Sequence, residues 1–334
     1  MKHLISIDDV TAAEIHRLFQ RVDGLVDARK SRRVLDLLQG KTLAMIFQKP
    51  STRTRISFHV AMAELGGDAL MLRQDEIQLG RGETFADTAR VLSRYVDGVM
   101  IRTFKQSDVE ALAKFGGIPV INGLTDLEHP CQVLGDLYTI RNKFSVLEVE
   151  VDVLHTLRER FSVQKAGQES SLAWGKIKIA YVGDGNNLAN SWLLAAGKLG
   201  LHLALATPRE YPPDEGIVRR ARELASESGA NLEIGSDPKG AAQGAHVIYT
   251  DTWVSMGAEK ERQERLSRFQ GFQVNAELLA GADPKAIVMH CLPAHRGEEI
   301  TDEVMDGPQS VVFDQAENRL HIQKGILVEL MASE

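Results

Sequence analysis

Hydroxyl and guanidinium side chains follow a short apolar run near the start of the chain. Residues 42–47 (TLAMIF) read as a buried strand that Pro50 ends, and the next helix begins with Ser51, Thr52 and Arg53. Free backbone N–H groups and the positive end of the helix dipole stabilise an anion at such a start. A lone Ser-Thr-Arg is more often an ordinary cap beside a solvated arginine. Here a buried strand leads directly into the cluster and a second arginine follows, which favours a phosphate site.

Two further side chains stand after neighbouring predicted strands. Arg102 follows the apolar run 98–101, and His129 lies in the segment after the run 118–121. Ligands bind beyond the carboxyl ends of the strands in a parallel sheet, so both are expected near Arg53. Arginine can offer paired donors to phosphate, and histidine can offer an N–H to a carbonyl oxygen. A histidine before proline is ordinarily a structural turn residue, but its place on this edge favours binding.

The second half of the chain places a carboxylate and a thiol at similar strand ends. Asp251 follows the run 247–250, and Cys291 ends the run 287–291. Cysteine is normally a buried hydrophobe, and that interpretation is kept for Cys131. For Cys291, which precedes a Leu-Pro pair, an active-site role is expected.

Two other chemistries of Cys291 are less well supported. His290 precedes it, but adjacent strand residues point to opposite faces, so this histidine is poorly placed to activate a thiol nucleophile. Metal binding by Cys291, His290 and His295 is not expected, because neither a second cysteine nor a carboxylate stands at ligand spacing. The sequence therefore predicts no metal and no covalent intermediate.

A glycine-containing turn, GDGNN at residues 183–187, follows a predicted strand and resembles a dinucleotide-binding loop only weakly. Leu188 occupies the third glycine position of G-x-G-x-x-G, and the next strand leads into Thr-Pro instead of an acid for a ribose. An NAD enzyme is therefore a distant alternative. Asn186 and Asn187 are better explained as turn residues or as amides for a polar substrate.

The chain alternates apolar strands with helices, which is typical of parallel sheets covered on both faces. An amphipathic helix is expected over residues 6–29 with Ser6 as cap, and another after Ser51 with Ile56, Val60 and Ala63 on its apolar face. The predicted strands are 42–47, 69–72, 98–101, 118–121, 178–182, 201–206, 232–234, 247–250 and 287–291. Further helices are predicted at 85–95, 109–115, 189–198 and 217–228. The fold class is α/β, with two doubly wound parallel-sheet domains in series.

A polar and charged segment, residues 144–174, separates the two alternating halves. It has little strand character, and residues 149–161 are expected to add a helix on the surface. The segment is treated as an interdomain insertion without a role in chemistry.

Composition limits the classes of function. The 334 residues are 43% hydrophobic and 25% charged, which is typical of a globular protein of about two domains. The start of the chain lacks the apolar core of a signal peptide, no run is long enough for a membrane span, and two cysteines are too few for a disulfide framework. A net charge of −7 argues against a general nucleic-acid binder. We expect a soluble, cytoplasmic protein.

Four motifs in order resemble the aspartate/ornithine carbamoyltransferase family, most closely its ornithine-specific branch. They are STRTR at 51–55, HPCQVLGD at 129–136, DTWVSMG at 251–257 and HCLPAHRG at 290–297. The match runs over nearly the whole chain, although the insertion at 144–174 departs from the usual family pattern. The resemblance implies a carbamoyl phosphate-binding domain at 1–143, completed by a C-terminal helix at 315–334, and an ornithine-binding domain at 175–314.

The resemblance also implies a set of site residues. Those expected to bind carbamoyl phosphate are Ser51, Thr52, Arg53, Thr54, Gln78, Arg102, His129, Gln132, Cys291, Leu292 and Arg319. Those expected to bind ornithine are Asn187, Asp251, Ser255 and Met256. Thr54, Arg102 and His129 are candidates to donate to the carbonyl oxygen, whereas Asp251 and Cys291 are candidates to anchor ornithine and help remove its proton.

The activity implied is transfer of the carbamoyl group from carbamoyl phosphate to the δ-amine of L-ornithine, giving L-citrulline and phosphate, without a cofactor. The family implies trimers or assemblies of trimers, with Gln78 reaching a neighbouring subunit's site. One alternative is a paralogue with another acceptor, such as aspartate, putrescine or N-acetylornithine. Another is a catalytically silent anion-binding regulator of the same fold.

Overall fold

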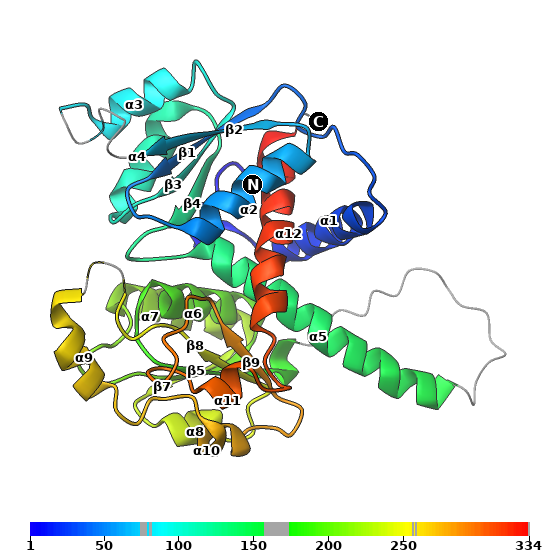
Figure 1. The fold of residues 1–334 in the computed structure, drawn as a ribbon, viewed down its shortest axis with the longest axis vertical. Helices are drawn as coiled ribbons and strands as arrows, with labels where there is room; N and C mark the ends of the chain where they lie inside the picture. The colour runs from blue at the N-terminus through cyan, green and yellow to red at the C-terminus, as the bar shows by residue number, and fades with distance from the viewer. Residues whose placement is uncertain (74–78, 80–81, 157–173, 256, 258, 333–334) are drawn as a thin grey trace.

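The computed structural model describes residues 1–73, 79, 82–156, 174–255, 257 and 259–332. Two parallel sheets organise these residues, one of four strands in the order β2-β1-β3-β4 and one of five in the order β7-β6-β5-β8-β9. Figure 1 shows the two sheets in separate halves of an elongated molecule, each with helices around it. The predicted α/β class with two parallel-sheet domains is confirmed.

The first half carries the four-stranded sheet. Its strands are β1 (Thr42–Phe47), β2 (Asp68–Arg73), β3 (Gly98–Arg102) and β4 (Val120–Leu124). Its helices are η1 (Ile7–Asp9), α1 (Ala12–Lys30), α2 (Thr52–Glu64), α3 (Phe85–Leu92) and α4 (Gln106–Gly116). Every residue of β3 is buried, as expected of a central parallel strand covered on both faces.

The second half carries the five-stranded sheet. Its strands are β5 (Lys178–Val182), β6 (His202–Ala206), β7 (Asn231–Gly235), β8 (Val247–Thr250) and β9 (Ile287–His290). Its helices are η2 (Trp174–Lys176), α6 (Asn187–Leu199), α7 (Glu215–Ser228), α8 (Pro238–Ala242), η3 (Glu259–Glu261), α9 (Arg262–Arg268), α10 (Ala276–Ala280) and α11 (Asp302–Met305). The strand order reverses direction at β5, where β6 lies on one side and β8 on the other. Such a switch point is where open α/β sheets bind ligands.

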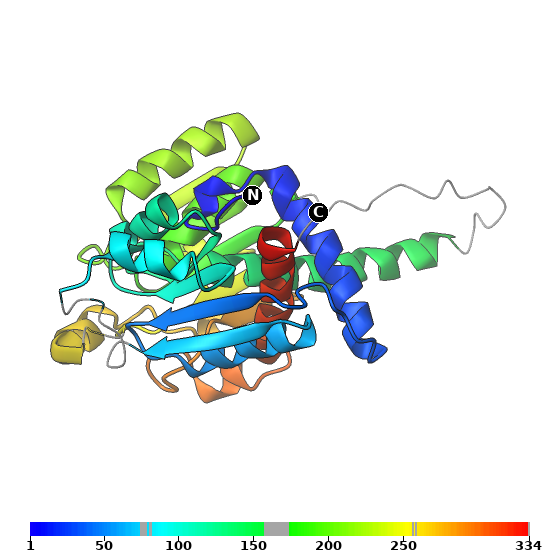
Figure 2. The same cartoon turned by 90° about the horizontal axis from the view of Figure 1, so that it is seen from above.

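Two long helices join the halves. α5 (Pro130–Thr156) follows β4 and runs past the second sheet, and α12 (Val312–Met331) returns from the second half to pack against α1, α2 and α5. Figure 1 shows α12 spanning both halves, and Figure 2 shows it nearly end-on beside the first sheet. The far part of α5 extends away from the body in both views. The expected return of the C-terminal helix to the first domain is confirmed.

Three expectations about helices are wrong in detail. α1 begins at Ala12 with Thr11 as its N-cap, because Ser6 instead caps the short helix η1, where it accepts from the Asp8 N–H. The buried face of α2 is formed by Thr54, Phe58, Ala61 and Met62. Of the three residues assigned to its apolar face, Ile56 is 56% exposed, Ala63 is also exposed and Val60 is half-buried.

The segment at 144–174 is described only in part. Residues 149–156 continue α5 and do not start a separate added helix. The remainder, from 157 to 173, lies outside the described residues. Among the helices that are described, none has the length and apolar character needed to cross a membrane.

Candidate active site

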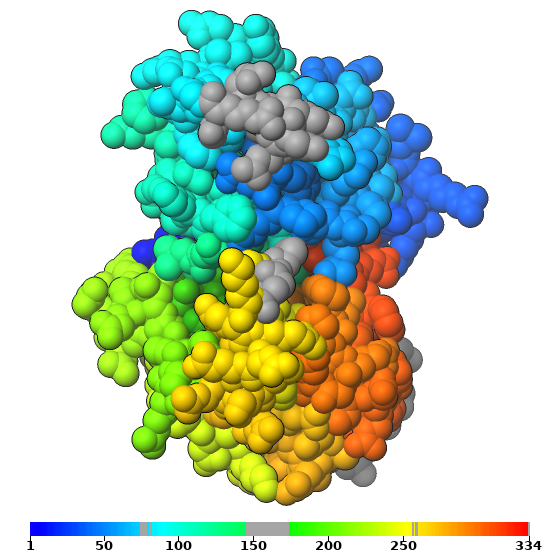
Figure 3. All heavy atoms as spheres, turned by 60° about the vertical axis from the view of Figure 1, so that its left-hand side comes forward, coloured from blue at the N-terminus to red at the C-terminus, as the bar shows by residue number. Residues whose placement is uncertain are grey.

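A cleft of about 910 Å³ opens between the carboxyl ends of the two sheets. The sequence-predicted residues that line it are Ser51, Thr52, Arg53, Arg102, His129, Gln132, Asn187, Asp251, Ser255, Cys291, Leu292 and Arg319. Thr54 is buried behind them, and Gln78 and Met256 lie outside the described residues. In Figure 3 the segment around α9, in yellow, stands at the boundary between the two halves. The fold thus brings side chains from both halves to one cavity.

Three arginines concentrate positive charge on the first-domain side of the cleft. Arg102 and Arg319 are buried, and Arg53 is partly buried at the N-terminus of α2. The Nε atoms of all three are buried and have no hydrogen-bond partner among the described residues. Burial, followed by the charges of Arg319 and Arg53, lowers the pKa of Arg102 to about 10. Cations held this close together are stabilised by an anion, and arginine pairs with phosphate in a fork geometry.

Hydroxyl groups at the start of α2 complete this anion-binding geometry. Ser51 is the N-cap of the helix, as predicted, and its Oγ accepts from the Thr54 N–H at 3.3 Å. Ser51 Oγ also lies 3.0 Å from Thr54 Oγ1, which accepts from Nη2 of Arg319 at 2.8 Å. A residue of α12 therefore helps to orient the first turn of α2. Free N–H groups at a helix start favour bound phosphate.

His129 and Gln132 add neutral polar groups to the first-domain side of the cleft. The backbone N–H of His129 donates to Ser191 Oγ at 2.9 Å, which fixes it against α6 of the second half. Burial and the nearby Arg319 and Arg102 hold the pKa of His129 well below its usual range, so its imidazole is neutral at pH 7. Its Nδ1 and the Gln132 Oε1 are buried without a partner among the described residues. Both are available to a ligand.

Asp251 and Cys291 line the opposite side of the cleft, which belongs to the second half. The Cys291 thiol donates to Asp251 Oδ1 at 2.8 Å, and Asn186 Nδ2 donates to Oδ2 at 2.8 Å. Burial, and then the Asp251 carboxylate, raises the pKa of Cys291 well above its ordinary value. The thiol is therefore protonated at neutral pH, which is unfavourable for a thiolate nucleophile. A carboxylate held in the cleft can instead bind an ammonium group.

The histidine next to Cys291 is engaged with other groups. Cys291 lies just past the end of β9, so the expected alternation of strand side chains does not apply to it, and a His290 ring nitrogen lies within 4.8 Å of its thiol. His290 Nε2 lies 3.0 Å from Glu299 Oε1, and His290 Nδ1 accepts from the Leu292 N–H at 2.9 Å. Both ring nitrogens are thus occupied by groups other than the thiol.

Two features near the cleft were missed by the sequence argument. Asn186, not Asn187, contacts Asp251, while Asn187 Nδ2 donates to the Thr125 carbonyl oxygen at 2.5 Å. Lys49 is buried in the cleft wall, pairs with Asp126 and lies over the ring of Phe104 at 4.4 Å from its centroid. The position of Lys49 directly before Pro50, at the end of the predicted strand, was the signal in the sequence that could have placed it at the cleft.

The view that no carboxylate stands near the histidines and Cys291 is wrong. Ligand-type atoms of Asp251, His290 and Cys291 lie within 4.8 Å of one another, and so do those of His295, Glu298 and Glu299. In the sequence, the signal for the second group is the pair of glutamates that follows His295.

Two family models match this chain in chain order. Residues 2–142 match the carbamoyl-P binding domain of aspartate/ornithine carbamoyltransferase, and residues 175–330 match the Asp/Orn binding domain. The chain belongs to the aspartate/ornithine carbamoyltransferase family. The division between the two models falls between the two sheets.

Individual members of the aspartate/ornithine carbamoyltransferase family align along nearly the whole chain. An ornithine carbamoyltransferase of Gloeobacter violaceus is 50% identical over 328 residues, which cover 98% of this chain and 95% of that protein. An anabolic ornithine carbamoyltransferase of Pyrococcus furiosus is 49% identical over 330 residues, covering 99% and 96%. The solved structure of ornithine carbamoyltransferase from Pyrococcus furiosus superposes with a TM-score of 0.88, covering 99% of this chain and 97% of that chain. The fold and the order of motifs are therefore those of the carbamoyltransferase family.

Proposed function

We propose that this carbamoyltransferase moves the carbamoyl group from carbamoyl phosphate to the δ-amine of L-ornithine, releasing L-citrulline and phosphate. The proposal rests on the cluster of Arg53, Arg102 and Arg319 on one side of the cleft, which we call the arginine wall. Arg53, Arg102 and Arg319 carry Nε groups with no partner among the residues that the structure describes, across the cleft from the pair Asp251 and Cys291. One side suits a phosphate, and the other suits an amino acid with an ammonium group.

The reaction needs positioned groups more than a cofactor. The amine nitrogen bonds to the carbamoyl carbon, the bond from that carbon to the phosphate oxygen breaks with its electron pair on phosphate, and the amine loses a proton. Negative charge develops on the carbonyl oxygen during attack. Thr54, Arg102 and His129 are the candidate donors to that oxygen, and oriented donors in a partly dry cleft supply a large share of such rate enhancements. Thr54 keeps its hydroxyl proton for this role, since Arg319 donates to it.

Two neutral groups support the carbamoyl end of the site. His129 is buried and uncharged, so it can donate one N–H without adding a further cation to the arginine wall. Gln132 donates through Nε2 to Asp136 at 2.8 Å, which turns its unpartnered Oε1 into an acceptor for the carbamoyl amide. Ser51, Thr52, Cys291 and Leu292 are proposed as further carbamoyl phosphate contacts.

The ornithine end of the cleft is proposed to lie on the second half. Asp251 binds the α-ammonium, with its carboxylate oriented by Asn186 and Cys291. Asn187, Ser255 and Met256 are proposed to contact the same end of the substrate. Putrescine lacks the α-amino acid end and could not use Asp251 in the same geometry, and the acetyl group of N-acetylornithine removes the α-ammonium charge, so the arrangement favours ornithine.

The domain roles follow the two sheets. Residues 1–143 with the helix at 315–334 are proposed as the carbamoyl phosphate domain, and residues 175–314 as the ornithine domain. The contact from Arg319 to Thr54 supports the assignment of the last helix to the first domain. A cytoplasmic location is part of the same proposal.

Association of copies into trimers or multiples of trimers is also proposed. A groove of about 1100 Å³ lies beside α2 and β2 and shares Ser51 and Thr52 with the cleft. Ile56, which lines the groove, is 56% exposed, and Leu70 in β2 is 50% exposed, so apolar surface of the kind found at interaction sites faces water here. A copy seated there would reach the phosphate site, which fits the proposed role of Gln78. Mixed oligomers of Gln78→Ala and Arg53→Ala should then regain activity, and no recovery after verified subunit exchange would refute the shared site.

Product analysis tests the proposed activity. The purified chain, given carbamoyl phosphate and ornithine, should form citrulline and phosphate in equal amounts at a rate proportional to protein. A variant with both Arg53→Ala and Arg102→Ala should be inactive. A wild-type chain that binds carbamoyl phosphate but forms no citrulline would instead be a silent regulator.

A further inference from the structure

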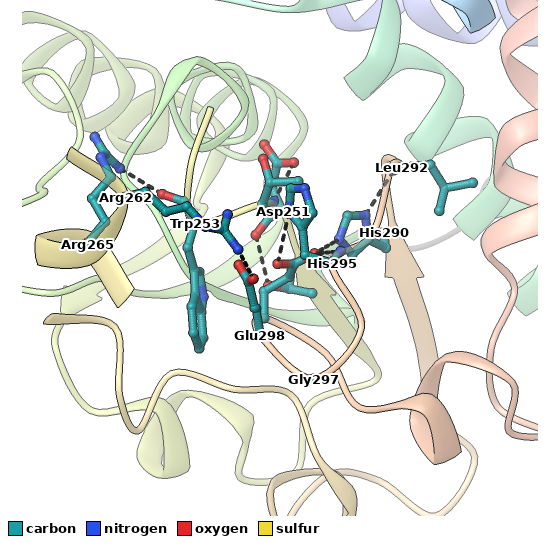
Figure 4. A network of polar contacts seen from close by, with 12 residues as sticks. Asp251, Trp253, Arg262, Arg265, His290, Leu292, His295, Gly297 and Glu298 are labelled. Atoms are coloured by element: carbon teal, nitrogen blue, oxygen red, sulfur yellow. Dashed lines mark hydrogen bonds and ion pairs between the residues drawn. The ribbon is translucent and has the colours of Figure 1, made fainter. Parts of the chain in front are cut away.

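The turn after β9 gathers three metal-ligating side chains at the margin of the cleft. His295, Glu298 and Glu299 each offer a ligand-type atom within 4.8 Å of those of the other two. Gly297, at φ +86°, allows the turn, and the Glu298 N–H closes it onto the His295 carbonyl oxygen at 2.9 Å. Figure 4 shows His295 and Glu298 facing the same space below Asp251. The backbone thus holds the three side chains together before any ligand arrives.

One atom of each side chain in this group is buried without a hydrogen-bond partner among the described residues. These atoms are His295 Nδ1, Glu298 Oε2 and Glu299 Oε2. Glu299 is fully buried, at 0% exposure, so its free oxygen is cut off from water. His295 Nδ1 lies 3.7 Å from this oxygen, which is beyond hydrogen-bond distance, so a cation between the two atoms would pair with both.

We propose that His295, Glu298 and Glu299 bind a divalent cation of the zinc type. His295 Nδ1 lies 3.7 Å from Glu299 Oε2, close to the spacing of about 3.4 Å between neighbouring ligands of a tetrahedral ion with bonds of about 2.0–2.1 Å. One imidazole and two carboxylates are a ligand set that zinc accepts, whereas calcium and magnesium prefer oxygen ligands alone. Three protein ligands leave a fourth position for water.

Surrounding contacts orient the ligands in the manner of known metal sites. Glu299 Oε1 accepts from His290 Nε2 at 3.0 Å and from the His295 N–H at 2.5 Å, which turns Oε2 towards the site. Arg262 pairs with Glu298 Oε1, and Glu298 Oε2 has no hydrogen-bond partner within the described part of the chain. The site carries two carboxylates against one nearby arginine, so a dication is electrostatically favoured.

The site is reachable and is coupled to the cleft. The His295 side chain is 40% exposed and lines the cleft, which gives an ion a path of entry. His290 links Glu299 to the cleft. Its Nε2 contacts Glu299 Oε1, and its Nδ1 accepts from the Leu292 N–H. An ion bound to Glu299 would therefore change, through His290, the position of the segment that carries Cys291 and Leu292.

Calorimetric titration of the tag-free, full-length protein with Zn²⁺ tests the site. We expect about one ion per chain, and an affinity lowered at least about tenfold in His295→Gln and in Glu298→Gln. Glu298 is chosen because its side chain is 22% exposed, so the variant is expected to fold; thermal unfolding without zinc checks this. His202→Gln is the matched control, because His202 pairs with Glu233 at 2.8 Å on the surface of the second half.

A second arm separates this site from zinc bound by Cys291, His290 and Asp251. Co²⁺ bound at the proposed site should lack the charge-transfer absorption of a cobalt thiolate, and Cys291→Ser should bind Zn²⁺ as the wild type does. Three results would overturn the proposal. They are no saturable Zn²⁺ binding, binding unchanged in His295→Gln and Glu298→Gln, and binding lost in Cys291→Ser.

Discussion

Nη2 of Arg319 in α12 donates to Oγ1 of Thr54 in α2 at 2.8 Å, across 265 positions of sequence. The contact joins α12 to the start of α2, where we propose that phosphate binds. Because α12 also packs on α1 and α5, the arginine wall is held by both ends of the chain. The site therefore depends on the closed fold and not on the STRTR motif alone.

Arg53→Ala should raise the dissociation constant for carbamoyl phosphate at least about tenfold. A phosphate in the cleft would lose charge-assisted hydrogen bonds worth roughly 1.5–3 kcal/mol each. Calorimetric titration with carbamoyl phosphate measures the change. Arg219→Ala, on the exposed surface of α7, is the control and should bind as the wild type does. An unchanged constant in Arg53→Ala would remove the start of α2 from the site.

Asp251→Asn should lower kcat/KM for ornithine at least about tenfold, or ~1.4 kcal/mol, because the α-ammonium loses its charged partner. The dissociation constant for carbamoyl phosphate should change little, since Asp251 lies on the side of the cleft that we propose for ornithine. Steady-state kinetics at saturating carbamoyl phosphate, with a parallel titration, separate the two effects. A fully active variant would show that the Asp251 carboxylate does not bind the α-ammonium of ornithine.

The rate should rise from neutral into alkaline pH. Only the uncharged δ-amine attacks, and an amine of this kind has a pKa of about 10.4, so the reactive form is scarce at pH 7. The raised pKa of Cys291 and the lowered pKa of His129 keep both groups neutral at pH 7. Profiles of kcat/KM against pH for the wild type and Cys291→Ser should therefore rise at the same position. A rate falling above pH 7 would contradict this account.

Stability should decrease as pH rises towards 7, and Glu128 should account for part of the decrease. Burial raises the pKa of this carboxyl from 4.5 to about 7. Between these values the folded chain keeps a proton that the unfolded chain has released, so raising the pH favours unfolding by up to about 1.4 kcal/mol per unit. Glu128→Gln should show a shallower change of the urea midpoint between pH 5 and 7. The exposed Glu110→Gln should follow the wild type. A slope unchanged by Glu128→Gln would mean that this group is ionised in the folded chain.

The elements with strong local signals were predictable from sequence. β1 occupies the predicted residues 42–47 and β8 the predicted 247–250, because short apolar runs between turn residues have few alternatives. Ser51 caps α2 as expected, since its hydroxyl precedes a helical pattern. The approach of Arg53 and Arg102 to each other was also predictable, because the carboxyl ends of parallel strands lie at the same edge of the sheet.

Features that depend on side-chain rotation were not predictable. The face of α2 that meets the core includes Phe58 and leaves Ile56 in water, and hydrophobicity alone does not separate the two. Asn186 and Asn187 are chemically identical neighbours, and the turn into α6 decides which one reaches Asp251. Tertiary packing sets these rotations.

Competition among acceptors tests the central claim most directly. Citrulline formation is measured at saturating carbamoyl phosphate, beside the products formed from aspartate, putrescine and N-acetylornithine. The account predicts the highest kcat/KM for ornithine, because Asp251 provides a partner for a free α-ammonium opposite the arginine wall. A higher kcat/KM for any of the other three acceptors would contradict the proposed substrate.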